Sequence, residues 1–417
     1  MDLFWIFGGI TLIGLVVYGL QILAVRSTLT SVGDSDSTTG SFETYPAISI
    51  LKPLKGLEDN LFDNLESFCI QDYPEYEIVC SLQDPNDPAY KVAQKIKDRF
   101  PDKNISIITE PCNQGLNPKI NNLIPAYRHA KHPCILISDS NVKVDKNYLK
   151  SIVKPFEDSR VGLISNLIRG MGGKTLGSLF ENLHLNSFIL GNVCLLDKYL
   201  GIQCVVGKSM LMRKTDLEAI GGLQAFNDVL AEDHLIGERI KERGQKIIIS
   251  NYMVNNANDY SELRKFMNRH TRWGKMRWKI GGVKYFSELI TNPVFISFLP
   301  LFFWGPRKET LSMNLSVCLI KVLGDYYLGK KIQASLNPLA YLLSPAKDLL
   351  IGLIWFIPLG SDTVVWRGNR YQIGKDTRLS LYPEKMQWSW KDKLMDPMRV
   401  KLEMLRGRSM RFRQLFG

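Results

Sequence analysis

Residues 3–25 carry no charged side chain and are mostly apolar, and this feature constrains the fold of the chain more than any other. As an α-helix the stretch would extend roughly 34 Å, enough to cross a hydrocarbon core of about 30 Å. No basic residue precedes it and no small-residue cleavage pattern follows it, which favours a transmembrane anchor over residues 1–26 rather than a cleaved signal peptide. Asp2 before the helix and Arg26 after it place the next residues in the cytoplasm by the positive-inside rule.

The residues that follow this anchor differ from it in composition. Residues 27–44 are small, polar and turn-forming, which predicts a linker. Over residues 45–258, short apolar runs alternate with helical patterns, which is typical of βαβ units around a mostly parallel sheet in an α/β fold. Strands are expected at 48–51, 77–82, 105–109, 134–138, 161–165, 205–212 and 246–250, with helices at 89–99, 118–130 and 232–242.

Basic residues are concentrated towards the end of the chain. The net charge is +12, and residues 366–417 alone hold 13 Lys/Arg against 5 Asp/Glu. Residues 259–285 interleave basic and aromatic side chains, as in helices that lie in a membrane interface. Residues 286–362 contain charge-poor runs broken by prolines, which predict two or three membrane-embedded segments, and 363–417 would form a basic cytoplasmic tail. This arrangement favours lipid headgroups over nucleic acid as the anionic partner.

Two aspartates follow predicted strands at their carboxyl ends. Asp84 comes after the strand at 77–82 and Asp139 after the strand at 134–138, and ligands of open α/β sheets bind at this edge. A carboxylate there can contact a nucleoside or hold a hard divalent cation beside phosphates. Simpler explanations exist, since Asp84 begins a turn rich in Pro and Asn and Asp139 could cap the next segment. If Asp139 binds a metal, Asn141 or a later oxygen ligand must complete the shell.

Two further patterns lie downstream. Glu232 and Asp233 begin a predicted helix, where the helix dipole favours acids, but Asp233 could also accept the proton of an attacking hydroxyl. Arg269, Arg272 and Trp273 form an Arg-x-x-Arg-Trp pattern, in which two guanidinium groups could clamp a diphosphate and the indole could face a sugar or lipid. A plain interfacial basic helix would explain these last three residues equally well.

The order of these elements resembles that of membrane glycosyltransferases of the GT-A fold: two strand-end aspartates, a Glu-Asp pair, then Arg-x-x-Arg-Trp ahead of apolar segments. More specifically, the chain is similar to the ceramide glucosyltransferases of family 21. The resemblance covers about residues 46–371 and is closest at 51–56 (LKPLKG), 71–74 (QDYP), 115–123 (GLNPKINNL), 206–214 (VGKSMLMRK) and 366–371 (WRGNRY).

The resemblance implies a GT-A nucleotide-sugar-binding domain with terminal transmembrane and interfacial helices. It implies an inverting transfer of glucose from UDP-glucose to a lipid hydroxyl, with ceramide as acceptor and a divalent cation, Mg²⁺ or Mn²⁺, as cofactor. It also assigns roles to eight residues: Asp233 as general base, Asp139 as metal ligand, Asp84, Lys52 and Lys55 in donor binding, and Arg269, Arg272 and Trp273 at the leaving group and acceptor.

Other functions remain open from the sequence. Eukaryotic members carry a His-Pro element before the GKSMLMRK stretch, whereas this chain has no histidine between His184 and His234. The acceptor could therefore be another lipid, such as a hopanoid or diacylglycerol.

A polymerising synthase needs more membrane helices than the sequence offers. A non-catalytic basic membrane protein would tolerate loss of all three aspartates. Arg26 and the basic segments predict an integral membrane protein with a cytoplasmic catalytic domain, in the inner or plasma membrane of a bacterium or the Golgi of a eukaryote.

Overall fold

The computed structural model describes residues 2–30, 45–366 and 368–382. One compact unit spans Met1–Ser380, and Leu381–Gly417 form a second unit. Residues 31–44 of the predicted linker and 383–417 of the predicted tail lie outside the described residues.

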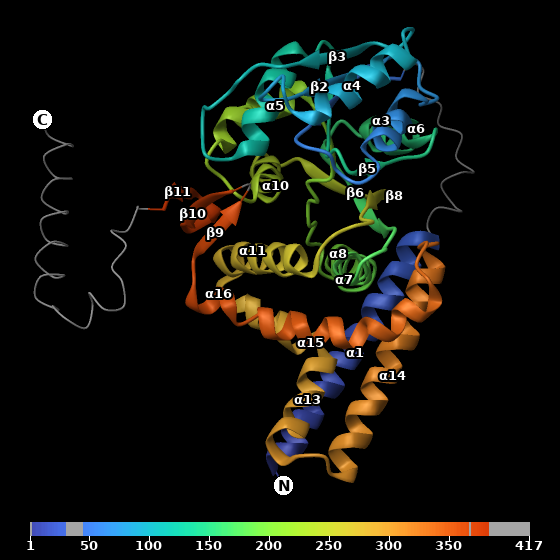
Figure 1. The fold of residues 1–417 in the computed structure, drawn as a ribbon, viewed down its shortest axis with the longest axis vertical. Helices are drawn as coiled ribbons and strands as arrows, with labels where there is room; N and C mark the ends of the chain where they lie inside the picture. The colour runs from blue at the N-terminus through green and yellow to red at the C-terminus, as the bar shows by residue number, and fades with distance from the viewer. Residues whose placement is uncertain (1, 31–44, 367, 383–417) are drawn as a thin grey trace, which may run out of the picture. The chain divides into compact units, whose positions relative to one another are not determined.

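The described residues contain one large mixed sheet (Figure 1). Its strand order is β3-β2-β1-β4-β7-β6-β8-β5. β1, β2, β3 and β4 run parallel, whereas β7 is antiparallel to both of its neighbours. The strands are β1 (Ile48–Pro53), β2 (Tyr76–Ser81), β3 (Ile105–Ile108), β4 (Cys134–Ser138), β5 (Val142–Lys143), β6 (Val161–Met171), β7 (Ser209–Arg213) and β8 (Lys246–Ala257).

All seven predicted strands are present, but three of them differ from the prediction by more than two residues at one end. β6 and β8 continue well beyond their predicted ends because they pair with each other in parallel as far as Met171 and Ala257. The strand predicted at 205–212 begins only at Ser209. The residues before it form a loop in which the N–H of Gly207 donates to the Asp233 side chain. This loop becomes part of the candidate site.

Helices cover both faces of the sheet, which explains why its central strands are apolar throughout. On one face α3 (Leu61–Cys69), α4 (Pro88–Arg99) and α6 (Tyr148–Val153) pack on Ile50 and Leu136. On the other face α5 (Pro118–His129), α9 (Lys214–Ala219) and α10 (Glu232–Glu242) pack on Leu51 and Ile135. The alternation of neighbouring residues between two cores is the period of two that a strand imposes.

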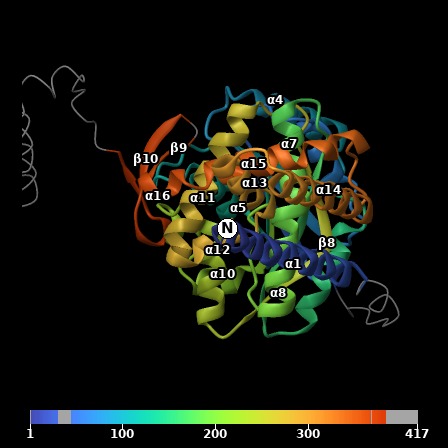
Figure 2. The same cartoon turned by 90° about the horizontal axis from the view of Figure 1, so that it is seen from below.

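A second group of helices adjoins the sheet domain on the side of β6. Helices α7 and α11 pack against each other, and α7 also contacts β6 (Figure 1). Helices α1, α13 and α14 run side by side beyond them (Figures 1 and 2). These elements are α1 (Asp2–Thr30), α7 (Leu176–His184), the π-helical turn η2 (Leu185–Ile189), α8 (Leu190–Leu200), α11 (Leu263–Gly281), α12 (Phe286–Ile290), α13 (Pro293–Trp304), α14 (Lys308–Lys331), α15 (Ser344–Ile354) and α16 (Ile357–Gly360).

Two stretches among the described residues are long and apolar enough to cross a membrane, by length and composition: Leu3–Thr30 and Pro338–Gly360. A third would exist if Leu263–Ile290 and Pro293–Trp304, which are bent by 67°, formed one broken span. Helix α14, which carries Lys321 and Asp325, is not among them. The helix of the N-terminal anchor also continues to Thr30, past the predicted boundary at residue 26.

The beginning of the predicted basic tail is folded. Strands β9 (Thr363–Trp366) and β10 (Asn369–Ile373) pair antiparallel. A short strand, β11 (Leu379–Leu381), follows. Val364 and Tyr371 pack with Leu230, which lies just before α10. The beginning of the predicted tail therefore packs on the rest of the chain, because alternating apolar residues give it a face that can be buried.

Candidate active site

The carboxyl ends of β1 and β4 meet at one edge of the sheet, and Lys52 links them. Its Nζ atom donates to Ser138 Oγ at 3.1 Å and to the carbonyl of Asp139 at 2.9 Å, and it lies 3.6 Å from the centre of the Phe68 ring. Burial lowers the pKa of Lys52 to about 7. Because this side chain is completely buried, it positions the backbone that carries Asp139.

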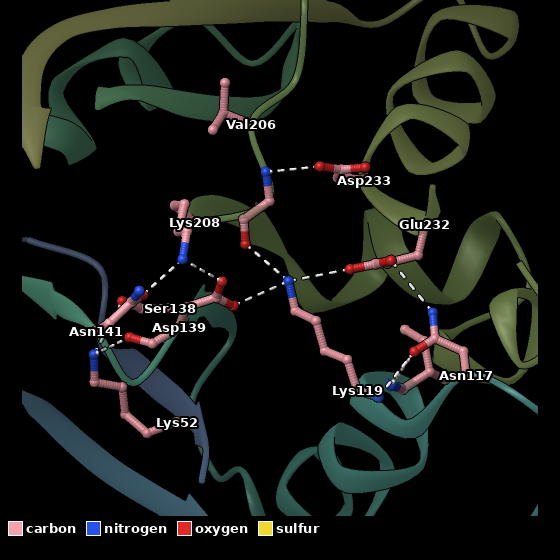
Figure 3. Close-up of polar contacts among 12 residues, drawn as sticks. Lys52, Asn117, Lys119, Ser138, Asp139, Asn141, Val206, Lys208, Glu232 and Asp233 are labelled. Atoms are coloured by element: carbon pink, nitrogen blue, oxygen red, sulfur yellow. Dashed lines mark hydrogen bonds and ion pairs between the residues drawn. The ribbon is translucent and has the colours of Figure 1, made fainter. Parts of the chain in front are cut away.

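Asp139 lies between two lysine side chains at this edge (Figure 3). Its Oδ1 atom is 3.1 Å from Lys119 Nζ, and its Oδ2 atom is 3.2 Å from Lys208 Nζ. Burial alone would raise the pKa of Asp139, but the two ammonium groups outweigh burial and hold that pKa well below its usual value. Lys208 also donates to the side-chain oxygen of Asn141 at 2.6 Å. Both oxygen ligands proposed for a metal therefore already contact lysine.

Lys119 extends this cluster to the acids at the start of α10 (Figure 3). Its Nζ atom is 3.1 Å from Glu232 Oε1 and donates to the carbonyl of Gly207 at 2.9 Å. Burial lowers the pKa of Lys119, but the charges of Asp139, Glu232 and Asp233 together raise it above its ordinary value. Lys119 is therefore a protonated bridge between the two parts of the site.

Asp233 accepts two backbone hydrogen bonds that fix its carboxylate. Oδ2 accepts from the N–H of Gly207 and Oδ1 from the N–H of His234, both at 2.9 Å. A Cβ atom at position 207 would lie 2.8 Å from Asp233 Oδ2, so glycine permits this close approach. The turn before α10 is held by Thr377, whose Oγ1 accepts from the N–H of Ala231 at 3.1 Å. The general-base candidate is thus oriented by its surroundings.

The Arg-x-x-Arg-Trp motif lies on α11 and is held from α7. Glu181 accepts from Arg269 Nη1 at 3.0 Å and contacts His270 Nε2 at 3.1 Å. Burial opposes ionisation of Glu181, but the charges of Arg269 and His270 lower its pKa to about 2. Arg272 lies over the Trp366 ring of β9 at 5.5 Å, and Trp273 packs edge-on against His270.

A basic cleft of about 290 Å³ runs along this helix. It can take an anionic group, because four of the side chains that line it are cationic. The lining residues are Glu262, Arg264, Lys265, Asn268, Arg269, Arg272 and Val365.

The remaining predicted residues lie at the surface. Asp84 is exposed, and its Oδ1 accepts from the N–H of Asn86 at 2.8 Å, which is the turn contact that a purely structural explanation predicts. Lys55 is also exposed. The structure thus brings Asp139 and Asp233 into one hydrogen-bonded cluster, whereas Asp84 and Lys55 belong to exposed loops.

The side chains around Asp139 do not fit a divalent cation in this arrangement. Such an ion takes six or more oxygen ligands, but both oxygens of Asp139 and that of Asn141 are engaged by Lys119 and Lys208. Across the part of the chain that the structure describes, no group of three or more His, Cys, Asp or Glu side chains could hold a metal ion.

Sequence reasoning gives no role to Lys119, Lys208 or Glu181. A signal existed for the two lysines, because each lies inside a stretch that resembles family 21, at 115–123 and 206–214. None existed for Glu181, since its helix, α7, was not among the predicted elements and its partner on α11 is distant in sequence.

Comparisons with known proteins agree with this picture. The chain is 25% identical over 351 residues to ceramide glucosyltransferase 1 of Caenorhabditis elegans, covering 81% of this chain and 73% of that protein. It is 34% identical over 169 residues to ceramide glucosyltransferase of Gibberella zeae, covering 37% and 32%.

Among solved structures, a mannosyltransferase from Pyrobaculum calidifontis in complex with GDP-Man and Mn²⁺ shows a weak likeness. The TM-score is 0.45 with 14% identity, covering 84% of this chain and 99% of the other. Staphylococcus aureus TarS 1-349 in complex with UDP-GlcNAc gives 0.37 with 15% identity, covering 81% and 100%.

The protein combines a mixed α/β sheet, a charged cluster at the carboxyl edge of that sheet, and adjoining helices that are apolar enough to cross a membrane. The model of the family described as glycosyl transferase family 21 matches residues 8–379. The chain belongs to this family and is a sugar-transferring enzyme.

Proposed function

We propose that this protein transfers glucose from UDP-glucose to the primary hydroxyl of ceramide. The observation that carries the proposal is the oriented Asp233 carboxylate beside the charged cluster at the sheet edge, in a family 21 chain similar to ceramide glucosyltransferases along most of its length.

Asp233 acts as the general base. Its oxygens accept hydrogen bonds from Gly207 and His234, so the carboxylate keeps its orientation. A lipid hydroxyl is a weak nucleophile, and removal of its proton as the bond to the anomeric carbon forms lowers the barrier. Attack on the face opposite the departing nucleotide inverts the configuration, so an α-linked donor gives a β-linked lipid.

The leaving group is stabilised from α11. Arg269 and Arg272 line the basic cleft, and guanidinium groups bind phosphate oxygens in a bidentate manner. Glu181 fixes Arg269, so little side-chain freedom is lost when a phosphate binds. Trp273 closes the acceptor side, while exposed Asp84 and Lys55 contact the nucleotide. Lys52 acts indirectly, because it holds the backbone of Asp139.

The membrane supplies the acceptor, and the sheet domain faces the cytoplasm, where soluble nucleotide sugars are made. The basic residues of α11 and Arg26 support this orientation. Protease added outside sealed cells is expected to spare the sheet domain, and to degrade it only after the cells are opened. Degradation in intact cells would reverse the orientation.

Product analysis tests the reaction directly. Purified protein in lipid nanodiscs is incubated with UDP-glucose, UDP-galactose or UDP-GlcNAc and with ceramide, diacylglycerol or a hopanoid, and the lipids are analysed by mass spectrometry and NMR. We expect β-glucosylceramide from UDP-glucose and ceramide only. Asp233→Asn should slow formation of this product by about 100-fold or more, whereas Glu242→Gln, which changes an exposed carboxylate on the same helix, should not. An α-linked product, or glucose on another lipid alone, would refute the proposal.

A further inference from the structure

The two lysines that hold Asp139 reach it from different parts of the chain. Lys119 comes from the first turn of α5, which begins at Pro118 and is capped by the Asn117 side chain. Lys208 comes from the loop before β7. Their side chains remain 14% and 18% exposed, so neither lysine is sealed from solvent. The amino-terminal end of α5 adds a partial positive charge on the same side.

A divalent cation and these lysines compete for the same oxygens. To bind Asp139, the ion would have to displace two ammonium groups and then remain beside them, and like charges at such short range repel strongly. Lys119 is further held by Glu232 and by the carbonyl of Gly207. Lys208 is further held by Asn141. The cluster is therefore already neutralised by its own cations.

We propose that Lys119 and Lys208 bind the diphosphate of the donor, and that donor binding by this chain does not require a divalent cation. Phosphate oxygens take the place of Asp139 oxygens at the two Nζ atoms. Asp139 keeps the lysines in position in the free enzyme. This inference rests on the proposed function, since it assumes that a nucleoside diphosphate sugar is the donor.

Binding of UDP to the full-length protein in nanodiscs tests the inference without turnover. Isothermal titration calorimetry in EDTA, in Mg²⁺ and in Mn²⁺ should give dissociation constants within about threefold of one another. Lys208→Met should weaken binding in EDTA by about 10- to 100-fold, the usual effect of losing a hydrogen bond between charged groups. Lys95→Met, on the exposed face of α4, is the matched control and should bind like wild type.

Asp139→Asn separates the two explanations by the sign of its effect. If the lysines serve the diphosphate, removing the carboxylate that competes for them leaves UDP affinity unchanged or increases it by up to about tenfold. If Asp139 holds a metal that binds the diphosphate, the same change weakens UDP binding and abolishes any effect of added Mg²⁺. Lys119→Arg, which keeps the charge, should retain most of the affinity, so a folding defect of an uncharged variant cannot mimic the result.

The outcomes distinguish this inference from the proposed function. UDP that binds only in the presence of Mg²⁺ or Mn²⁺ overturns the inference and leaves the proposed function intact. Equal binding in EDTA together with loss in Lys208→Met supports it. A folded protein that binds UDP under no condition contradicts both.

Discussion

Two clusters in this molecule have the same composition, two lysines and two acids, but different surroundings. At the sheet edge, Lys119, Lys208, Asp139 and Glu232 have side chains that are 7–25% exposed. Among the apolar helices, the second cluster has side chains that are 0–7% exposed. It consists of Lys321 and Asp325 on α14 and Lys347 and Asp348 on α15.

The difference lies in what can replace the internal partners. In the helical cluster, Lys321 contacts Asp325 and lies 3.6 Å from Asp348, and Tyr18 of α1 donates to Asp325 at 2.8 Å. These contacts tie α1, α14 and α15 together, and the cavity that Tyr18, Lys321 and Asp348 help to line measures only about 30 Å³, which leaves room for little more than water. At the sheet edge the same kinds of charge can exchange partners. We infer that the ion pairs of the helical cluster fix the helices relative to one another, whereas those at the sheet edge can be exchanged for a ligand.

The largest expected effect concerns Asp233, which lies beside the cluster at the sheet edge. Asp233→Asn removes the proposed base but keeps the size and most hydrogen bonds of the side chain. We expect kcat to fall by about 100- to 10,000-fold, with UDP affinity and melting temperature close to wild type. Steady-state kinetics, calorimetry and thermal unfolding measure the three quantities.

A different pattern for Asp233→Asn would break the comparison. If the variant lost stability as strongly as a helical-cluster variant, Asp233 would be structural. If kcat stayed near wild type while UDP binding failed, Glu232 would become the candidate base.

The second prediction concerns the helical cluster. Lys321→Met leaves Asp325 and Asp348 without their shared cation, and removing one partner of a buried ion pair typically costs about 3–5 kcal/mol. We expect the melting temperature in nanodiscs to fall markedly, while the remaining folded protein binds UDP normally.

Lys331→Met is the control for this change, because Lys331 is exposed on the same helix. Lys208→Met in the cluster at the sheet edge should give the opposite result, with weak UDP binding and a small change in stability. Equal loss of stability in Lys208→Met and Lys321→Met would show that the two clusters do not differ in the way their exposure suggests.

Glu181 sharpens the comparison because it is as buried as the helical cluster but contacts the site motif. Its pKa in the folded protein is about 2, compared with an ordinary value of 4.5. The folded-state pKa is lowered, so the ion pair stabilises the fold fully above pH 4.5. That contribution, about 3 kcal/mol, is lost as the pH falls towards 2.

Unfolding measured against pH for wild type and Glu181→Gln checks this expectation. The stability difference between the two proteins should be largest above pH 4.5 and shrink between pH 4.5 and pH 2. A difference that does not change with pH would mean that Glu181 acts through packing, without its charge.

Local sequence patterns predict much of the fold. The strands β1 and β4 and the helices α4, α5 and α10 lie at or near their predicted positions. Buried strands appear in the sequence as short apolar runs, and helices as apolar residues at helical spacing that begin at a capping residue. The extensions of β6 and β8 depend on pairing between strands about 80 residues apart, which leaves no local pattern.

The site is only partly predictable for the same reason. Asp139 and Asp233 stand out because each follows or begins a clear element. Their connection does not, since it depends on Lys119 and Gly207 arriving from other parts of the chain. Spacing along the sequence indicates which residue types could form a site, whereas their ionic partners follow from the sheet order.

The smallest expected effect concerns Asp84, which is exposed and lies outside both clusters. Asp84 lies at the carboxyl end of β2 and contacts the backbone of its own turn, so no buried charge loses its partner when it changes. Asp84→Asn should weaken UDP binding by about tenfold, because one charged hydrogen bond to the nucleotide becomes neutral, while kcat and melting temperature stay near wild type. Calorimetry with UDP and with UMP measures the effect. The same loss for both ligands places Asp84 at the nucleoside, and a loss for UDP alone places it at the diphosphate. If Asp84→Asn binds both ligands like wild type, Asp84 serves only its own turn. The cluster at the sheet edge then binds the donor without it.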